Sequence, residues 1–254
     1  MLSKNKMKWL RSLEMKKHRT AEQVFVAEGP KVVGDLLTAG FDCIFAAMTE
    51  TCGLQGRLTC EVCMVSQEEL QRISFVETPQ QVLAVFRQPQ YATDVKVAQT
   101  ELCLALDDVQ NPGNLGTIIR LADWFGIEHV FCSRGCADVY NPKTVQATMG
   151  ALAHVKVHYV DLPQMLGDLC HGNDGNVPVY GTFLDGDSIY AKALQQRGVI
   201  VMGNEGRGVS ADVERYVTER LLVPNFPAER MSTESLNVAI ATAVVCAEFR
   251  RRAL

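Results

Sequence analysis

Residues 102–126 read LCLALDDVQNPGNLGTIIRLADWFG, and this stretch decides the fold class. Its first five residues are apolar without a break, which predicts a strand buried on both faces of a sheet. Pro112 and Gly113 then predict a tight turn, and Asn114 is placed to cap the following helix with its side-chain oxygen. A buried strand, a polar loop and a helix in this order indicate one unit of a parallel α/β fold.

The chain beyond this stretch continues the same alternation of apolar runs and helices. We therefore expect a mostly parallel sheet with helices on both faces. A last helix is predicted over residues 234–251, where apolar residues recur at helical spacing. The predicted strands of this half are residues 102–106, 129–132, 155–160, 177–183, 199–202 and 221–223.

The chain before residue 102 predicts a second, smaller α/β unit. Residues 4–16 alternate apolar and basic side chains and predict one amphipathic helix. Ser66, followed three residues later by Glu69, predicts the start of another helix with a capping box. Residues 88–99 are polar and carry Pro89, which is typical of a linker, so we predict domains at residues 1–93 and 94–254. Strands are predicted at residues 25–27, 43–47, 60–65 and 82–86.

Composition excludes several classes of protein. A hydrophobic content of 47% with 21% charged residues is that of an ordinary globular protein. No apolar run reaches the length of roughly 18 residues that a membrane span needs, and the start of the chain lacks a signal-peptide core, so we expect a cytoplasmic protein without membrane contact. Nine scattered cysteines, an odd number, predict no disulfide framework. Cys60 and Cys63 fall in a predicted strand and face opposite sides, so no metal site is expected there.

The distribution of charge leaves two interpretations open. The formal net charge of −4 argues against a protein that coats nucleic acid with a basic surface. Basic residues nevertheless crowd the first twenty positions, among them Lys16, Lys17 and Arg19, and three arginines stand at 250–252. Such clusters occur both on solvated helix faces and at nucleic-acid contacts.

Three loops at the predicted carboxyl ends of strands are where ligands of an open parallel sheet bind. In the first loop and its helix, Arg120 lies among apolar residues, which fits either an ion pair with Asp123 or with an acid of a neighbouring element, or a functional site. The second, residues 203–208, carries three glycines but no phosphate-binding pattern, which disfavours a nucleoside triphosphatase. The third brings Ser235 and Asn237 to the start of the last helix, where capping alone would explain the serine.

Taken together, these loops resemble the three motifs of the SpoU (TrmH-like) RNA methyltransferases of the SPOUT superfamily. Asn114 and Arg120 match the first motif, an asparagine and an arginine separated by five residues. Residues 203–208 match the second, G-x-E-G-x-G, and residues 235–238 the third, S-L-N-V. The N-terminal part is similar to the family's L30e-like substrate-binding domain through Arg19 and residues 25–30, which is a looser match.

The resemblance implies a fold and a set of partners. It implies a parallel sheet threaded into a deep trefoil knot, a homodimer with the active site near its interface, and RNA as substrate, ribosomal RNA more than transfer RNA. It implies S-adenosylmethionine as cofactor, with no metal because the methyl donor is already activated. The residues expected to hold the cofactor are Thr182, Gly203, Asn204, Gly206, Val223 and Leu236.

The implied reaction is methyl transfer to a ribose 2′-hydroxyl, which requires alignment and stabilisation of a developing alkoxide. We assign stabilisation to Arg120, since a guanidinium stays protonated and is a poor base. The resemblance implies that Asn114, Glu205, Ser235 and Asn237 position the ribose, its phosphate and Arg120.

One departure and one alternative accompany this hypothesis. Residues 225–234 form a longer loop than the family's and lack its glycine, so Arg230 is a candidate for contact with RNA, and we expect Lys16, Lys17 and Arg19 to contact phosphates. The alternative is a noncatalytic RNA-binding protein that retains the fold.

Overall fold

The protein is described by a computed structural model that covers residues 2–171, 177–227 and 235–253. Two compact units divide the chain: residues up to 90 together with 138–154, and residues 91–137 together with those from 155 onward. The predicted boundary at residue 93 is close to the first division, but nothing local predicts that residues 138–154 pack with the first unit. The assignment of two domains at 1–93 and 94–254 stays a prediction.

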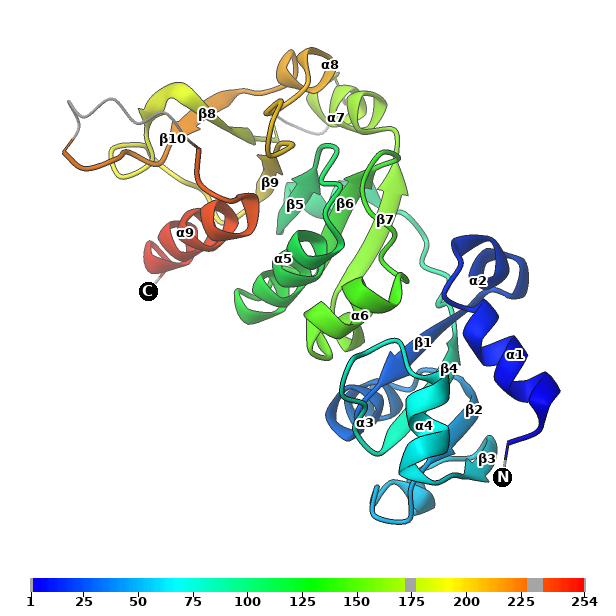
Figure 1. Cartoon of the computed structure of the whole chain (residues 1–254). Helices are drawn as coiled ribbons and strands as arrows, with labels where there is room; N and C mark the ends of the chain where they lie inside the picture. Colours follow the sequence, from blue (N-terminus) through cyan, green and yellow to red (C-terminus); the bar gives the residue numbers. More distant parts are fainter. Residues whose placement is uncertain (1, 172–176, 228–234, 254) are drawn as a thin grey trace. The chain divides into compact units, whose positions relative to one another are not determined.

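The first unit is built on a four-stranded mixed sheet in the order β1, β4, β2, β3 (Figure 1). Strand β4 is antiparallel to both β1 and β2, whereas β3 is parallel to β2. The capping box predicted at Ser66 and Glu69 is present and begins α4. The strands are β1 (Val24–Glu28), β2 (Cys43–Met48), β3 (Glu61–Met64) and β4 (Val82–Arg87), and the helices are α1 (Lys4–Ser12), α2 (Lys16–Glu22), α3 (Pro30–Thr38), α4 (Gln67–Ile73), α6 (Pro142–Thr148) and the short 3-10 helices η1 (Gln55–Arg57) and η3 (Ala151–Ala153).

The helix predicted over residues 4–16 is present as α1 but ends at Ser12, because the chain breaks before α2 begins at Lys16. Arg19 stabilises the break: its buried guanidinium donates to the carbonyl oxygens of Leu13 at 2.7 Å and Glu14 at 2.6 Å. These oxygens follow the end of α1 and would otherwise lack a helical partner. The same guanidinium forms an ion pair of 2.7 Å with Asp138, which ties residues 138–154 to this unit.

The second unit is built on a six-stranded sheet in the order β10, β8, β9, β5, β6, β7, and all of its pairings are parallel. The predicted parallel sheet is therefore confirmed. Strand β8 continues further than predicted and shifts register against β10 between Arg220 and Leu221. The strands are β5 (Leu102–Leu106), β6 (His129–Ser133), β7 (Lys156–Val160), β8 (Val179–Ser188), β9 (Gly198–Met202) and β10 (Glu219–Leu222).

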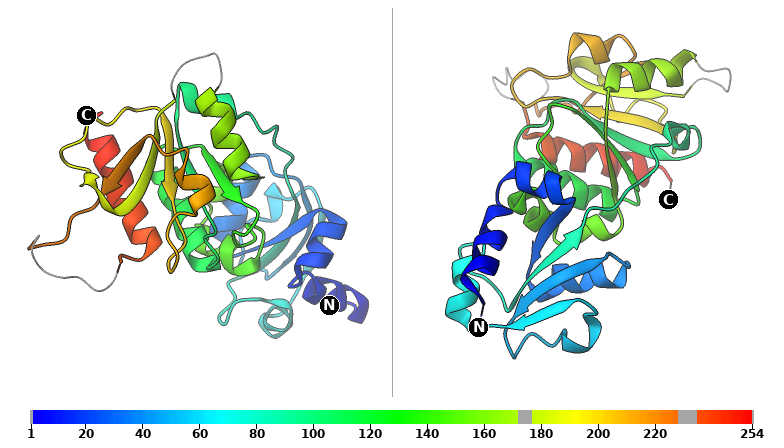
Figure 2. Two further views of the ribbon diagram at one scale, coloured as in Figure 1. Left: turned by 90° about the horizontal axis from the view of Figure 1, so that it is seen from above. Right: turned by 90° about the vertical axis from the view of Figure 1, so that its right-hand side faces the viewer.

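Helices cover both faces of this sheet, as alternating side chains require. On one face, α7 (Leu162–His171) and α8 (Ala211–Glu214) pack with Val179, Val199 and Val201. On the other, the ring of Tyr180 meets Phe249 of α9 (Val238–Arg251), and α9 packs against α5 (Pro112–Trp124). Figure 2 shows α7 and α9 on opposite sides of the strands. A 3-10 helix, η2 (Val95–Gln99), precedes β5.

The three arginines at residues 250–252 form hydrogen bonds and ion pairs within the fold at the end of α9. Arg250 donates to the carbonyl oxygens of Phe125 and Gly126, which follow α5. Hydrogen bonds from Arg251 and Arg252 lower the pKa of Glu248 to about 2. These arginines therefore stabilise the fold, which accounts for a cluster that sequence alone left open.

Two general properties concern the described residues only. In these ranges no helix combines the length and the apolar character that crossing a membrane requires. The same residues contain no group of three or more His, Cys, Asp or Glu side chains placed to hold a metal ion. The threading of the chain into a knot stays a prediction.

A buried histidine pair lies between β6 and β7. The rings of His129 and His158 stack with centroids 5.3 Å apart, and His129 Nδ1 lies 3.2 Å from His158 Nε2. Burial, followed by the neighbouring His129 and Lys156, lowers the pKa of His158 to about 4, and burial also lowers the pKa of His129. The folded protein thus holds both rings neutral at a pH where the unfolded chain takes up protons.

Acidification is expected to destabilise the second unit through this pair. The folded pKa of His158 lies below the unfolded value of about 6.5, so its stabilisation is complete above pH 6.5 and is lost as the pH falls toward 4. Urea unfolding between pH 7.5 and 5.5 should give a falling free energy of unfolding. His158→Asn should reduce the slope by up to one proton. Equal slopes for wild type and His158→Asn would contradict this assignment.

Candidate active site

The parallel register of β5 and β9 brings two of the three predicted loops together. Leu106 pairs with Met202, so residues 107–111 and 203–208 leave the sheet at the same edge and side by side. Strand β8 lies on the other side of β9, where Gly181 pairs with Val201. The edge therefore gathers the residues that follow three adjacent strands, as expected for a ligand site in a parallel sheet.

The helix that follows the first loop begins one turn earlier than predicted. Asn111 caps α5, because its side-chain oxygen accepts from the backbone N–H groups of Gly113 at 2.8 Å and Asn114 at 3.2 Å. Pro112 occupies the first helical turn, where its missing N–H costs nothing. The prediction that Asn114 is the cap is wrong, and the consequence is functional: the Asn114 side chain is free to contact the other loops.

Hydrogen bonds through Asn114 connect all three predicted loops. Its Nδ2 donates to Glu205 Oε1 at 2.6 Å, and its Oδ1 accepts from Asn237 Nδ2 at 3.1 Å. Asn237 in turn caps α9, since its Oδ1 accepts from the backbone N–H groups of Ala239 and Ile240. The α9 amino terminus, Asn237, Asn114 and Glu205 thus form one continuous hydrogen-bonded chain, which we call the amide chain.

Backbone hydrogen bonds join the two ends of the second loop, and the loop's conformation requires glycine at two positions. Asn204 and Gly208 exchange two backbone hydrogen bonds of 2.9 Å, and Gly208 has a positive φ of 71°. A side chain at Gly203 would meet the backbone of Gly208 at 2.3 Å, so only glycine fits there. The Asn204 side chain accepts from the N–H groups of Gly206 and Arg207, which fixes the tip from which Glu205 projects.

The residues expected to hold the cofactor lie around this loop and beyond it toward β10. Thr182 on β8 is half-buried, and its hydroxyl donates to the carbonyl oxygen of Val201 at 3.3 Å. Val223 follows β10 and is half-buried, while Leu236 is 52% exposed beside Asn237. None of these three side chains is fully buried, so each is accessible to a ligand.

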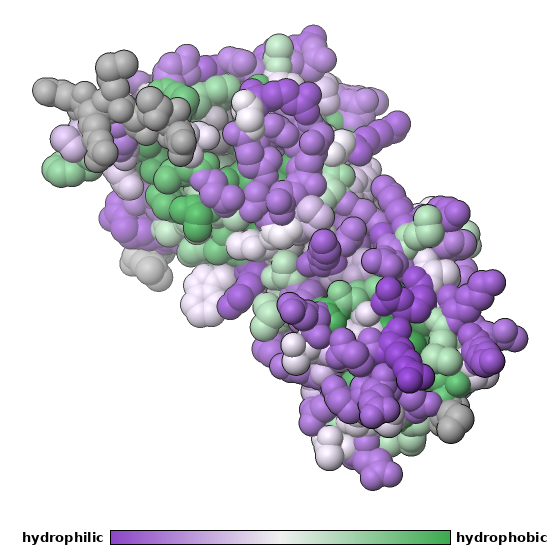
Figure 3. Space-filling view, viewed as in Figure 1, coloured by the Kyte–Doolittle hydropathy of each residue, from purple (hydrophilic) through white to green (hydrophobic). Residues whose placement is uncertain are grey.

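Arg120 does not join the amide chain. It lies six residues after Asn114 and therefore about 9 Å further along the axis of α5. Its side chain is exposed, and no described residue gives it a hydrogen bond or an ion pair, which leaves the alternative of a pair with Asp123 without support. Trp124, one turn later on the same face, is 83% exposed. Figure 3 shows apolar side chains gathered over α9, where Ile240 is 55% exposed.

The remaining predicted residues separate into accessible and inaccessible ones. Lys16 and Lys17 are exposed at the start of α2, and Ser235 is exposed before α9. Arg19 is 1% exposed, and the contacts described above occupy its guanidinium, so the expectation that it contacts phosphate is corrected. Arg230 lies outside the described residues.

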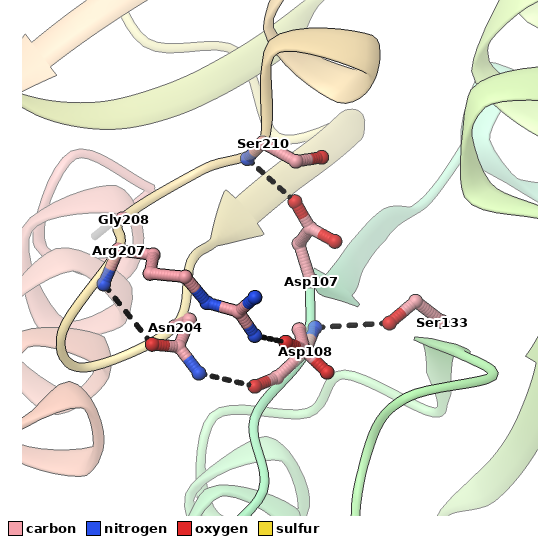
Figure 4. A pocket seen from close by; sticks show the side chains of 7 residues that line it. All are labelled: Asp107, Asp108, Ser133, Asn204, Arg207, Gly208 and Ser210. Atoms are coloured by element: carbon pink, nitrogen blue, oxygen red, sulfur yellow. Dashed lines mark hydrogen bonds and ion pairs between the residues drawn. The ribbon is translucent and has the colours of Figure 1, made fainter.

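Sequence reasoning missed a pocket of about 300 Å³ at the carboxyl ends of β5, β6 and β9 (Figure 4). Asp108 organises its wall despite a left-handed φ of 60°. Its N–H donates to Ser133 Oγ at 2.9 Å, its carbonyl oxygen accepts from Asn204 Nδ2 at 2.8 Å, and its carboxylate pairs with Arg207. Two acids directly after a buried strand were the available signal. The lining residues are Asp107, Asp108, Ser133, Asn204, Arg207, Gly208 and Ser210.

Comparison with known sequences identifies two regions. Residues 101–247 match the SpoU rRNA Methylase family, and residues 4–84 match the MRM3-like substrate binding domain. A 23S rRNA (guanosine(2553)-2′-O)-methyltransferase of Bacillus subtilis is 34% identical over 250 residues, which cover 96% of this chain and 96% of that protein.

Two solved structures resemble the whole chain. A TrmH-family protein from Porphyromonas gingivalis has 44% identity and a TM-score of 0.89, covering 99% of each chain. An rRNA methyltransferase from Sinorhizobium meliloti, solved with bound AdoMet, has 28% identity and a TM-score of 0.85, covering 100% of this chain and 98% of its own.

Proposed function

The chain belongs to the SpoU rRNA methylase family, and on that premise we propose how its residues perform the family's reaction. It is an RNA ribose 2′-O-methyltransferase that uses S-adenosylmethionine, and ribosomal RNA is favoured over transfer RNA as its substrate. The observation that carries the assignment of the site is the amide chain, in which one asparagine holds all three motifs together. The cytoplasmic location stays a prediction.

We assign the cofactor to the loops after β8, β9 and β10. The backbone of residues 203–206 would hold its polar groups, and Thr182, Val223 and Leu236 would contact its adenine ring. These residues fit such a group because the tip is closed by glycine and the apolar side chains beside it are incompletely buried. When bound, S-adenosylmethionine supplies an electrophilic methyl group on a sulfonium.

The protein's own task is to orient the ribose and to stabilise charge. Glu205 is exposed at the tip of its loop and is held by Asn114, so its second carboxylate oxygen remains available to the 2′-hydroxyl. Asn237 and Ser235 stand at the amino end of α9, where backbone N–H groups favour an anion such as the ribose phosphate. The proton of the 2′-hydroxyl would pass to this free Glu205 oxygen, and the Arg120 guanidinium would stabilise the alkoxide as it forms, which is electrostatic catalysis by a fixed charge.

A second copy of the chain would bring Arg120 to the reacting ribose. Arg120 is remote from the amide chain of its own protomer, yet it shares an exposed face of α5 with Trp124. Ile240 adds exposed apolar surface on α9, which packs against α5. Exposed apolar side chains on two helices that pack together are typical of a surface that a protein partner covers. We therefore propose a homodimer formed through α5 and α9.

Exposed lysines of the first unit are the candidates for contact with RNA. Lys16 and Lys17 stand in the first turn of α2, and the guanidinium of Arg19 behind them is bound to backbone carbonyls and Asp138. Phosphate contacts at Lys16 and Lys17 would position the RNA without reading its sequence. The alternative of a noncatalytic RNA-binding protein is disfavoured, because such a protein has no need of Glu205, Asn114 and Asn237 in one hydrogen-bonded chain.

Methyl transfer from labelled S-adenosylmethionine to total RNA tests the function. Wild type should label ribosomal RNA, and nucleoside analysis should place the label on ribose. Arg120→Ala should lower kcat by about a hundredfold or more, the usual cost of removing one transition-state donor, with unchanged cofactor affinity. Arg72→Ala is a matched control, since Arg72 is exposed on α4.

The assay tests the enzymatic function and the role of Arg120 separately. Wild type that neither binds cofactor nor transfers methyl contradicts the enzymatic function. Full activity of Arg120→Ala contradicts only the role of that arginine.

Sedimentation equilibrium tests the proposed dimer. Wild type should be dimeric at micromolar concentration, and Trp124→Glu should yield a folded monomer with strongly reduced activity, because a charge replaces an apolar interface side chain. Leu184→Glu is the matched control, since Leu184 is 80% exposed on β8. An active wild-type monomer would rule out the requirement for a partner's Arg120.

A further inference from the structure

Two acids after β5, Asp107 and Asp108, anchor the second loop although neither belongs to the three motifs. The carbonyl oxygen of Asp108 accepts from Asn204 Nδ2 at 2.8 Å near the start of the loop, and the Asp108 carboxylate pairs with Arg207 near its end. Just beyond the loop, the backbone N–H of Ser210 donates to Asp107 Oδ2 at 2.8 Å. The second loop is therefore attached to the residues after β5 at both of its ends.

The backbone of Asp108 connects three neighbouring strand ends. Its φ of 60° is left-handed, a conformation that side chains rarely adopt and that aspartate tolerates better than most. Its N–H donates to Ser133 Oγ at the end of β6, while its carbonyl oxygen accepts from Asn204 after β9 (Figure 4). Strands β9, β5 and β6 are adjacent in the sheet. Strained backbone of this kind persists where surrounding contacts impose it, and it is concentrated at functional sites.

The Asp108 side chain is held in place as firmly as its backbone. Its Oδ1 accepts from Gln110 Nε2 at 3.1 Å, and its Oδ2 pairs with Arg207. A side chain at Gly135, in the loop after β6, would overlap Asp108 Oδ1, so only glycine leaves room for the carboxylate. An ion pair between two mobile exposed side chains would fix little. Here the acid is only 25% exposed and has a defined position, so it can fix the arginine.

We propose that Asp108 is a positioning residue for methyl transfer, which fixes the second loop so that Glu205 meets the reacting ribose. The proposal rests on the RNA methyltransferase function given above. The hydrogen bond from Asn114 holds the Glu205 carboxylate but not the backbone that carries it. Asp108 holds that backbone, because it binds Asn204 and Arg207, which flank Glu205 along the chain. A displacement of about 1 Å at a reacting group can lower a rate by a factor of about a hundred.

Steady-state kinetics of Asp108→Asn with ribosomal RNA test this role. Asparagine tolerates the left-handed backbone and keeps both backbone hydrogen bonds, but it loses the ion pair with Arg207. The variant should lower kcat about tenfold, because the reacting groups are less well aligned. Its KM for RNA and its affinity for S-adenosylhomocysteine should stay within about twofold of wild type, since Asp108 touches neither ligand. Arg215→Gln is the matched control, because it breaks an exposed ion pair with Asp212 outside the loop.

Gly135→Ala provides a second, independent variant. Its added methyl group should displace the Asp108 carboxylate and lower kcat as Asp108→Asn does. Asp108→Gly removes the carboxylate, and glycine adopts the left-handed φ without strain. In the Asp108→Gly background, Gly135→Ala should therefore cause no further loss of activity. A further loss in that background would show that Gly135 does not act through Asp108 and would count against the proposal.

Hydrogen exchange of the second loop gives a readout that does not depend on activity. Backbone N–H groups of residues 204–208 should exchange faster in Asp108→Asn than in wild type, because the loop opens more often, whereas Arg215→Gln should match wild type. Unchanged exchange in Asp108→Asn overturns the proposal. So does an active wild type whose Asp108→Asn variant keeps full kcat or loses only affinity for RNA or cofactor. An inactive wild type with the expected exchange would refute the methyltransferase function and leave the attachment of the loop by Asp108 standing.

Discussion

One side-chain amide, that of Asn114, holds the candidate site together. Its two polar atoms are used in opposite senses, as donor to Glu205 and as acceptor from Asn237. This is possible only because Asn111 caps α5 and leaves Asn114 free, and because the parallel pairing of Leu106 with Met202 sets the two loops side by side. A change at Asn114 therefore alters how three loops meet.

The organisation of the sheet edge explains how donor and acceptor can meet. The loop after β9 is stiffened by its backbone bridge between Asn204 and Gly208 and by the bond from Asn204 to the carbonyl of Asp108. A stiff loop can carry different ligands on its two sides without collapse between them. Catalysis by orientation requires such rigidity, since the reacting atoms must be held within a narrow range of distance.

The sequence predicted most of the fold because the deciding signals are local. Continuous apolar runs such as residues 102–106 identify buried parallel strands, and Ser66 with Glu69 identifies a helix start. What sequence could not predict depends on distant partners. Sequence alone predicted that Arg19 contacts RNA, whereas in the structure it pairs with Asp138, which lies 119 positions away. The pocket likewise requires three strands to converge, so the two acids after β5 could indicate its place but not its walls.

The central claim is that the three motifs act as one unit through Asn114, and a double-mutant cycle of methyl transfer measures this directly. Asn114→Ala, Glu205→Gln and the double variant are compared by kcat/KM with ribosomal RNA at saturating cofactor. Residues that act as a unit are strongly non-additive. The double variant should therefore lose little more activity than the worse single variant. Losses in free energy that simply add would show that Asn114 and Glu205 act independently and would contradict the account.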